Sequence, residues 1–176
     1  MGHVSNYTIR RCTLDDAATI ARHRVEMFRD MGDVPTEELA RDLLGKSTSA
    51  LSVLLADGSY VGWFAIDAGG SVIAGAGVHI KPQLPRISHD HARIEDSPVP
   101  LAVNVYTEPQ WRGQGIARAL MREVMGWASE QGTDRVVLHA SDAGRPLYES
   151  LGFHSTNEMR WFVPGPNGRG LKKPQS

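Results

Sequence analysis

Residues 105–121 have the sequence VYTEPQWRGQGIARALM, which changes character twice along its length. We expect a strand up to Thr107, because residues 101–107 are rich in β-branched and aromatic side chains. Pro109 ends this strand, since proline has no N–H to donate to a neighbouring strand. An apolar stripe at helical spacing follows, formed by Ile116, Leu120, Val124 and Trp127. The stretch therefore predicts a strand, a short loop and a helix.

The loop contains two glycines, Gly113 and Gly115. The first N–H groups of a helix have no partner within the helix, and the helix dipole places partial positive charge at the same end. Glycines allow the backbone to approach an anion closely, because they carry no Cβ. We expect this loop to bind a pyrophosphate.

Two common phosphate-binding motifs do not fit. The ATP-binding pattern G-x-x-x-x-G-K-[ST] does not occur in the sequence. A dinucleotide-binding G-x-G-x-x-G pattern could start at Gly113, but its last position is Arg118, whose side chain would prevent close packing of the helix on the strand. An ordinary strand–turn–helix connection remains the alternative that needs no ligand.

Residues 112–117 fit a third pattern, [QR]-x-x-G-x-[GA], and resemble the coenzyme A pyrophosphate loop of the GNAT superfamily of acyl-CoA-dependent N-acyltransferases. A frame that starts at Gln110 also fits. We prefer the Arg112 frame, because Pro109 then stands where these enzymes commonly carry a proline. A second segment, LYESLGF at residues 147–153, resembles the L-Y-x-x-x-G-F segment near the C-terminal end of the same superfamily.

Composition is that of an ordinary globular domain. The chain has 176 residues, of which 41% are apolar and 22% charged, with a formal net charge of −1. We therefore expect one domain over residues 1–176, with a core from about 7 to 163 and a flexible tail at 164–176. The charge favours neither nucleic acid nor a membrane surface as a partner. Cys12 is the single cysteine, and no signal-peptide pattern or long apolar run occurs, so we expect a cytoplasmic protein.

Strand-like and helix-like segments alternate, which favours an α/β (α+β) fold with a mixed sheet. Expected strands are 7–12, 60–67, 71–80, 101–107, 135–140 and 161–163. Expected helices are 13–32, 35–45, 115–131 and 146–152, while 47–56 fits either a helix or a strand. The resemblance implies a central mixed sheet of about six to seven strands, flanked by helices and splayed between its fourth and fifth strands. Those two strands correspond to 101–107 and 135–140.

The connection from Lys81 to Pro100 carries two histidines and three acidic residues, namely His89, Asp90, His91, Glu95 and Asp96. Such a cluster could bind a metal ion, or it could form a solvated loop beside the substrate cleft. We expect the loop and no metal site.

The resemblance implies acetyl-CoA as the acyl donor. The end of the strand at 105–107 would pair with the pantetheine amides, and the amides of 113–118 would hold the pyrophosphate. Arg112 and Arg118 either add positive charge or are solvated surface residues. The implied cofactor-binding residues are Val105, Tyr106, Thr107, Arg112, Gly113, Gln114, Gly115, Ile116, Ala117, Arg118, Ser141 and Tyr148.

Tyr148 matches the family tyrosine that donates a proton to the departing thiolate. A phenol with a pKa near 10 is protonated at neutral pH and suits this role. The alternative is a half-buried packing residue. The family usually carries Asn seven positions before that tyrosine, and Ser141 stands there in this chain.

The general base is not assigned. Some family members carry a glutamate on the fourth strand, where this chain has Leu101. Glu26, Asp30 and Asp33 could face the acceptor, and His139 or Asn104 could order a water. The expected acceptor is a primary amine of a small molecule or peptide, in contact with residues Glu26, Phe28, Asp30 and Asn104. Acidic side chains on the first two helices would favour a cationic acceptor if they line the cleft, or they could equally face solvent.

Two functions fit this sequence. The first is an N-acetyltransferase, which could also be a homodimer. The second is an acyl-CoA-binding sensor that performs no turnover. A transferase of longer acyl chains is a variant of the first, if the cleft widens near Trp111 and Trp127.

Overall fold

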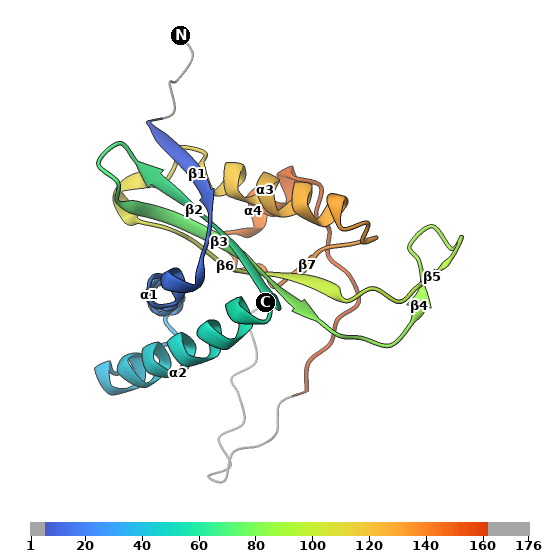
Figure 1. Cartoon of the computed structure of the whole chain (residues 1–176), viewed down its shortest axis with the longest axis horizontal. Helices are drawn as coiled ribbons and strands as arrows, with labels where there is room; N and C mark the ends of the chain where they lie inside the picture. Colours follow the sequence, from blue (N-terminus) through green and yellow to red (C-terminus); the bar gives the residue numbers. More distant parts are fainter. Residues whose placement is uncertain (1–5, 162–176) are drawn as a thin grey trace.

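A five-stranded sheet runs through the middle of the computed structural model, which describes residues 6–161 (Figure 1). The strand order is β1-β2-β3-β6-β7, and all neighbours are antiparallel except β6 and β7, which are parallel. These strands are β1 (Tyr7–Arg11), β2 (Tyr60–Asp67), β3 (Val72–Lys81), β6 (Val99–Thr107) and β7 (Val137–Leu138). The predicted mixed sheet with helices between its strands is confirmed.

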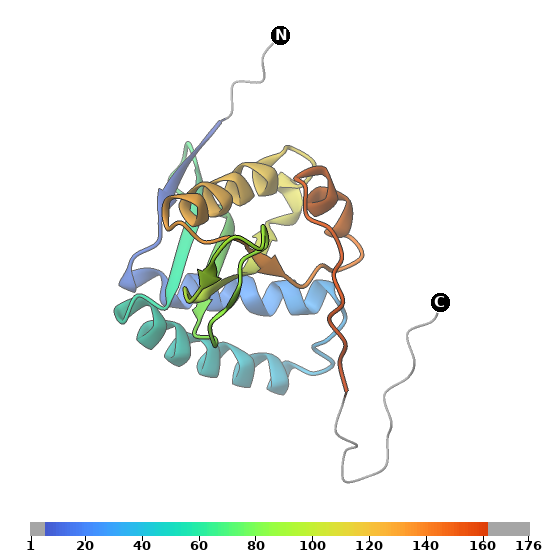
Figure 2. The same ribbon diagram turned by 90° about the vertical axis from the view of Figure 1, so that its right-hand side faces the viewer.

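Helices cover both faces of this sheet (Figures 1 and 2). On one face lie α1 (Ala17–Asp30) and α2 (Glu37–Ala56), side by side. On the other lie α3 (Ile116–Glu130) and the short α4 (Arg145–Ser150). The apolar stripe predicted for α3 faces the sheet, and its members Ile116, Leu120 and Val124 are buried. Burial of these side chains supplies most of the driving force for packing α3 on the sheet.

Short turns link several elements. A 3₁₀ turn at Leu14–Asp16 precedes α1, and the Thr13 amide donates to the Asp16 carboxylate at 2.7 Å, as in a capping box. A second 3₁₀ turn, at Pro109–Trp111, begins two residues after β6 ends. The proline therefore ends the strand as expected.

The second helix is longer than the sequence suggested. We expected it to close at Gly45, but α2 continues to Ala56 and includes the undecided residues 47–56. A glycine inside a helix costs only about 1 kcal/mol relative to alanine. Gly45 is exposed, while Ala40, Ser47 and Leu51 on the same helix are buried against the rest of the fold. Their burial outweighs the local preference of one glycine.

Within residues 6–161 the sheet has five strands, where about six to seven were expected for the whole chain. β7 contains two residues, whereas the sequence suggested a strand over 135–140. A strand is defined by the partner it pairs with, and β6 pairs with this segment at two positions only. In the expected last strand, Trp161 is exposed and not in a strand, and 162–163 lie outside the described residues.

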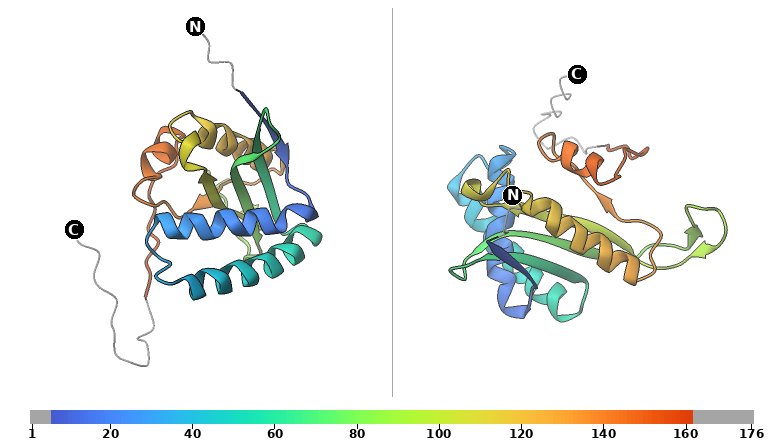
Figure 3. Two further views of the ribbon diagram at one scale, coloured as in Figure 1. Left: turned by 90° about the vertical axis from the view of Figure 1, so that its left-hand side faces the viewer. Right: turned by 90° about the horizontal axis from the view of Figure 1, so that it is seen from above.

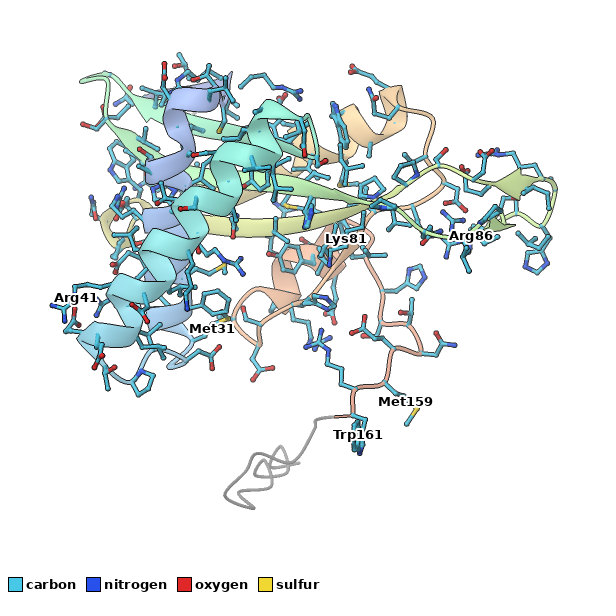
Figure 4. All side chains as sticks on the ribbon, turned by 60° about the horizontal axis from the view of Figure 1, so that its bottom comes forward. Met31, Arg41, Lys81, Arg86, Met159 and Trp161 are labelled. Atoms are coloured by element: carbon cyan, nitrogen blue, oxygen red, sulfur yellow. The ribbon has the colours of Figure 1, made fainter. Side chains whose placement is uncertain are left out.

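Residues 82–98 form an arm that extends away from the sheet (Figures 1 and 4). The arm contains β4 (Arg86–Ile87) and β5 (Ile94–Glu95), an antiparallel pair. Arg86 donates to Asp134 at 2.7 Å, and the same carboxylate accepts from the His89 amide at 2.9 Å. These bonds lower the pKa of Asp134 and hold the arm, at Arg86 and His89, against the loop between α3 and β7.

A β-bulge interrupts β6 at Asn104. Val103 pairs with Gly77 and Tyr106 with Gly75, so two residues of β6 stand opposite Ala76 alone. Asn104 has a φ of 55°, a left-handed conformation that asparagine tolerates better than most residues. Its side-chain amide donates to the Tyr60 hydroxyl at 3.1 Å.

Gly77 provides the space that this hydroxyl occupies. A Cβ built on Gly77 would lie 1.9 Å from the Tyr60 oxygen. Because β3 lies beside the bulge at this point, a side chain on residue 77 would displace Tyr60. Asn104 would then lose its hydrogen-bond partner.

We expect Gly77→Ala to destabilise the fold by about 1–3 kcal/mol, the usual range for overpacking a closed site. Gly126→Ala is the matched control, because a Cβ there meets nothing within 4 Å and the residue lies inside α3. The control should gain up to about 1 kcal/mol from helix propensity. Urea unfolding of both variants gives the comparison, and equal stability of Gly77→Ala and the unmodified protein would contradict the clash.

His23 on α1 is the most deeply buried histidine of the described residues, with 1% of its surface exposed. Its ring lies 4.9 Å from the Tyr106 ring and 5.6 Å from the Phe64 ring, measured between centroids. Neither ring nitrogen has a hydrogen-bond partner within residues 6–161. Burial, with a smaller effect of the nearby Arg22, lowers the pKa of His23 to about 4.

This burial predicts a pH-dependent stability. The pKa of His23 in the folded state lies below the unfolded value of about 6.5. Between pH 4 and 6.5 this histidine is therefore protonated to a greater extent in the unfolded chain than in the folded protein. The contribution of neutral His23 to the free energy of unfolding is complete above pH 6.5 and falls as the pH drops through this window. We expect a loss of about 2 kcal/mol between pH 7 and pH 5 from this residue. His79, whose pKa is also lowered by burial, contributes in the same direction.

Urea unfolding at pH 7 and pH 5 measures the loss. His23→Gln should reduce the difference between the two values, whereas the exposed His154→Gln should leave it unchanged. An unaltered pH dependence in His23→Gln would assign the effect to other groups.

Candidate functional site

One edge of β6 has no strand beside it over the second half of its length. β7 pairs with β6 only at Leu101 and Ala102. From Val103 to Thr107 no described strand pairs with this edge, while the opposite edge continues its pairing with β3. Figure 3 shows β7 leading away from the sheet toward α4. The sheet is therefore splayed between its fourth and fifth strands, as the resemblance implied.

Thr107, the last residue of β6, has a hydroxyl that is buried without a hydrogen-bond partner in the described part of the chain. A buried polar atom normally finds a partner, so this oxygen marks a place where a ligand can supply one. The Val105 side chain packs toward α3, and Tyr106 points to the other face, where its hydroxyl donates to Glu108 at 3.2 Å. Residues 105–107 thus have backbone and side-chain groups along an open edge.

The glycine loop lies between this edge and α3. Gly113 and Gly115 have φ values of 76° and 80°, which are left-handed and suit glycine. A Cβ on either residue would meet no atom within 4 Å, so the space above the loop is open. The glycines are needed for the backbone path and for close access to it.

The amides of this loop are unpaired. Within residues 6–161, none of the backbone N–H groups of Gly113, Gln114, Gly115, Ile116, Ala117 and Arg118 donates a hydrogen bond. The first turn of α3 thus offers a row of donors at the positive end of its dipole. Ile116 is buried in the core and fixes the position of this turn. The arrangement suits a phosphate or diphosphate.

The two arginines of this region bind other parts of the protein. Arg112 donates to the Thr107 carbonyl at 2.9 Å and to the Asp30 carboxylate at 2.6 Å. Arg118 donates to the Ser150 hydroxyl at 2.7 Å. Arg112 therefore joins β6 to the end of α1, and Arg118 joins α3 to α4. The backbone amides, in contrast, have no such partners.

Tyr148 lies on α4, half-buried against the core under α3. Its ring contacts Phe153 edge to face with a centroid distance of 6.1 Å, and burial raises the pKa of its hydroxyl. This hydroxyl is protonated at neutral pH, and no described residue forms a hydrogen bond with it. Such a group is free to donate a proton to a ligand.

Ser141 helps to build the turn that carries Tyr148. Its hydroxyl accepts from the Gly144 amide at 3.2 Å, and its carbonyl accepts from the Arg145 amide at 2.9 Å. The side chain therefore has a local structural role at the start of α4, in addition to the cofactor contact expected from the sequence.

The four expected acceptor residues do not gather at one place. Glu26 forms an ion pair with Arg29 at 3.5 Å and lines a small cavity of about 130 Å³ between α1 and α2. Asp30 is bound to Arg112. Phe28 and Asn104 come together through Arg24, which lies 4.8 Å from the Phe28 ring centroid and donates to Asn104 at 2.8 Å.

Sequence reasoning missed a larger cavity, of about 360 Å³, on the α2 side of the sheet. Its walls come from α1, α2 and the strands β2, β3 and β6, and they include Arg24, Tyr60 and His79. A signal for Arg24 existed: it stands four residues before Phe28 in α1, and such pairs share one helix face.

Glu108 was also missed, although it directly follows the central strand. Its carboxylate accepts from Arg22 at 2.8 Å and from the Tyr106 hydroxyl, and lies 3.6 Å from a His23 nitrogen. It closes the α1 side of the open edge. The alternative base candidate His139 is instead exposed, and contacts Arg160 and Glu158 near the end of the described chain.

Two negative findings apply to residues 6–161. No three His, Cys, Asp or Glu side chains come together in a way that could hold a metal ion. No helix of this part of the chain is both long and apolar enough to span a bilayer.

Comparisons with known proteins agree with this geometry. A relative, the aminoglycoside N(6')-acetyltransferase type 1 of Stenotrophomonas maltophilia, is 29% identical over 88% of this chain and 91% of its own length. A solved GCN5-related N-acetyltransferase of Ralstonia eutropha JMP134 is 32% identical, with a TM-score of 0.79 over 90% of this chain and 99% of that one. A predicted acetyltransferase of Clostridium acetobutylicum, solved with acetyl-CoA, is 25% identical, with a TM-score of 0.76 over 89% and 96%.

The model of the acetyltransferase (GNAT) family matches residues 20–153, which include β6, the glycine loop and the segment with Tyr148. The open strand edge, the unpaired amides and the family match all fall on the same residues, and the chain belongs to the acetyltransferase (GNAT) family.

Proposed function

We propose that this acyltransferase moves the acetyl group of acetyl-CoA to a primary amine of a small molecule or peptide. The observation that carries the proposal is the row of unpaired amides at 113–118 beside the open edge of β6. One set of donors suits a diphosphate, and the other suits an extended chain of amides. Coenzyme A contains both groups in this order.

On this proposal the loop amides hold the diphosphate, and residues 105–107 pair with the pantetheine amides as a neighbouring strand would. The buried Thr107 hydroxyl then gains a partner on the same edge. Gln114 lies at the rim of the loop, where its side chain reaches only the Gln110 carbonyl at 3.4 Å. Arg112 supports this site indirectly, because it fixes the end of β6.

The reaction joins the amine nitrogen to the thioester carbonyl carbon and breaks the carbon–sulfur bond. A tetrahedral oxyanion forms between these events, and a backbone N–H at the open edge of β6 stabilises it. Tyr148 gives its proton to the leaving thiolate and later regains one from solvent. Glu26 and Asp30 are each paired with an arginine. We therefore propose that water accepts the proton that the substrate ammonium loses before attack.

The diphosphate site predicts a charge-sensitive affinity. We expect Gln114→Glu to weaken acetyl-CoA binding about 10-fold, because a carboxylate at the loop repels the diphosphate. Gln131→Glu is the matched control, since Gln131 lies at the opposite end of α3. Calorimetric titration gives both affinities, and equal affinity in the two variants would count against the loop as the diphosphate site.

A ligand comparison tests the same site without mutation. Acetyl-CoA should raise the unfolding midpoint, because it binds the folded state only, while S-acetylpantetheine, which lacks the diphosphate, should raise it much less. Propionyl-CoA and succinyl-CoA in the same series report the width of the acyl site.

Tyr148→Phe tests the proton donor. We expect kcat to fall about 100-fold, the usual size of a general-acid contribution, with little change in acetyl-CoA affinity. Tyr7→Phe, on the distant β1, is the control and should retain full activity. Thiol release is followed with a panel of amines. Unchanged kcat in Tyr148→Phe would make this residue a packing group. If no amine in the panel elicits thiol release, the protein is a binding module.

A further inference from the structure

The cavity of about 360 Å³ on the α2 side adjoins the open edge of β6. Val103 and Asn104, which line it, are the first residues of β6 beyond its pairing with β7. Its volume falls at the lower end of the range for small-molecule sites. The cavity therefore opens beside the place where the proposed thioester would lie, on the opposite face of the sheet from α3.

Its walls are apolar with a basic rim. The apolar part comes from α2 and β6, through Leu43, Ala50, Leu51, Leu54, Leu101 and Val103. The charged side chains are Arg24, Lys46 and Lys81, and no aspartate or glutamate lines the cavity. Two further titratable groups line the cavity. Burial keeps the Tyr60 hydroxyl protonated, and partial burial, with Lys81 and Arg24, lowers the pKa of His79 against the smaller opposing effect of Asp57, so that His79 is neutral at pH 7. The cavity thus has positive charge without any opposing carboxylate.

Arg24 is the unusual member of this set. It is half-buried, and within the described residues its hydrogen bond goes to Asn104, a neutral amide. Its guanidinium also lies over the Phe28 ring. A carboxylate forms an ion pair with each of Arg10, Arg22, Arg29, Arg86 and Arg112, whereas Arg118, like Arg24, is half-buried with a neutral partner, the Ser150 hydroxyl.

A guanidinium has five N–H donors and stays charged at neutral pH. Removing such a group from water without an anion is unfavourable. The bond to Asn104 leaves most of these donors without a protein acceptor. None of these donors is among the buried unpartnered atoms of the described residues, so they are open to solvent, and an anion in the cavity can accept from them.

We propose that the acceptor of this enzyme is an amine that also carries a carboxylate or phosphate group, which Arg24 binds with Lys46 and Lys81 nearby. The inference rests on the proposed acetyl transfer and specifies its substrate class. The anion at Arg24 anchors the molecule, its carbon chain lies along the apolar wall of α2, and its amine reaches the open edge of β6. This reverses the sequence-based expectation of a cationic acceptor.

Pairs of acceptors that differ in one charge test this proposal. Thiol release from acetyl-CoA is measured with ω-amino carboxylates from glycine to 6-aminohexanoate, each against its primary amide, and with O-phosphoethanolamine against ethanolamine. We expect the best anionic member to exceed its neutral partner in kcat/KM by about 10-fold or more, as a charge-assisted hydrogen bond allows. The two series also distinguish a carboxylate from a phosphate.

Arg24→Gln should remove this preference. The variant keeps a side chain able to donate to Asn104 but lacks the charge, so KM for anionic acceptors should rise about 10- to 100-fold, and the ratio of kcat/KM between each anionic acceptor and its neutral partner should fall toward one. Arg41→Gln is the matched control, because Arg41 lies on the first turns of α2, well separated from Lys81 (Figure 4), and does not line this cavity.

The outcomes separate the two proposals. Equal use of charged and neutral partners by the unmodified enzyme, or an unchanged preference in Arg24→Gln, overturns the anionic acceptor and leaves acetyl transfer intact. Absence of both acetyl-CoA binding and thiol release refutes acetyl transfer itself. If acetyl-CoA binds but no acceptor turns over, titration of the CoA-bound protein with O-phosphoethanolamine decides: the Arg24→Gln variant must bind it more weakly than the unmodified protein, and equal affinities reject the site.

Discussion

The central constraint in this fold is that β6 loses its neighbour while still inside the molecule. Backbone N–H and C=O groups in a protein interior need partners, and a sheet normally supplies them strand by strand. β7 pairs at Leu101 and Ala102 and then leaves, so the rest of β6 has an open edge. The glycine loop that follows repeats the situation, with a row of amides that have no acceptor among the described residues. The open edge suits a ligand with amide groups, and the loop amides suit a ligand with phosphate groups. Both features occur in one continuous segment.

The bulge at Asn104 connects this open edge to the opposite face of the sheet. Arg24, Asn104 and Tyr60 form a chain of hydrogen bonds from α1 to β2, and the missing side chain of Gly77 makes room for the last of them. A left-handed residue inside a strand is strained and persists only where its surroundings hold it in place. The same contacts that hold the bulge also form the wall of the larger cavity. The proposed donor and acceptor sites therefore share one element.

The local parts of the site could be predicted from sequence, whereas the tertiary parts could not. Proline after a strand, two glycines and an apolar helical stripe depend on neighbours in the chain, and the structure has the strand, turn and helix where they were expected. The predicted end of α2 was wrong, because burial of Leu51 outweighs the low helix propensity of Gly45. The length of β7 depends on where β6 stops pairing, which no local pattern encodes. The role of Tyr148 stays a prediction, although its free hydroxyl and raised pKa fit an acid.

The charges on α1 and α2 explain why the proposed acceptor differs in charge from the cationic one that the acidic residues suggested. Glu26 and Glu37 both bind Arg29, and Asp30 binds Arg112, so these carboxylates are largely neutralised by their partners. Arg24 is on the same helix, yet it faces the sheet and has a neutral amide as its partner. A ligand responds to charge that the protein has left unpaired, and burial makes such a charge more effective than an exposed one. A half-buried arginine without a carboxylate partner is therefore a better guide to the charge of the acceptor than several acids that are already paired.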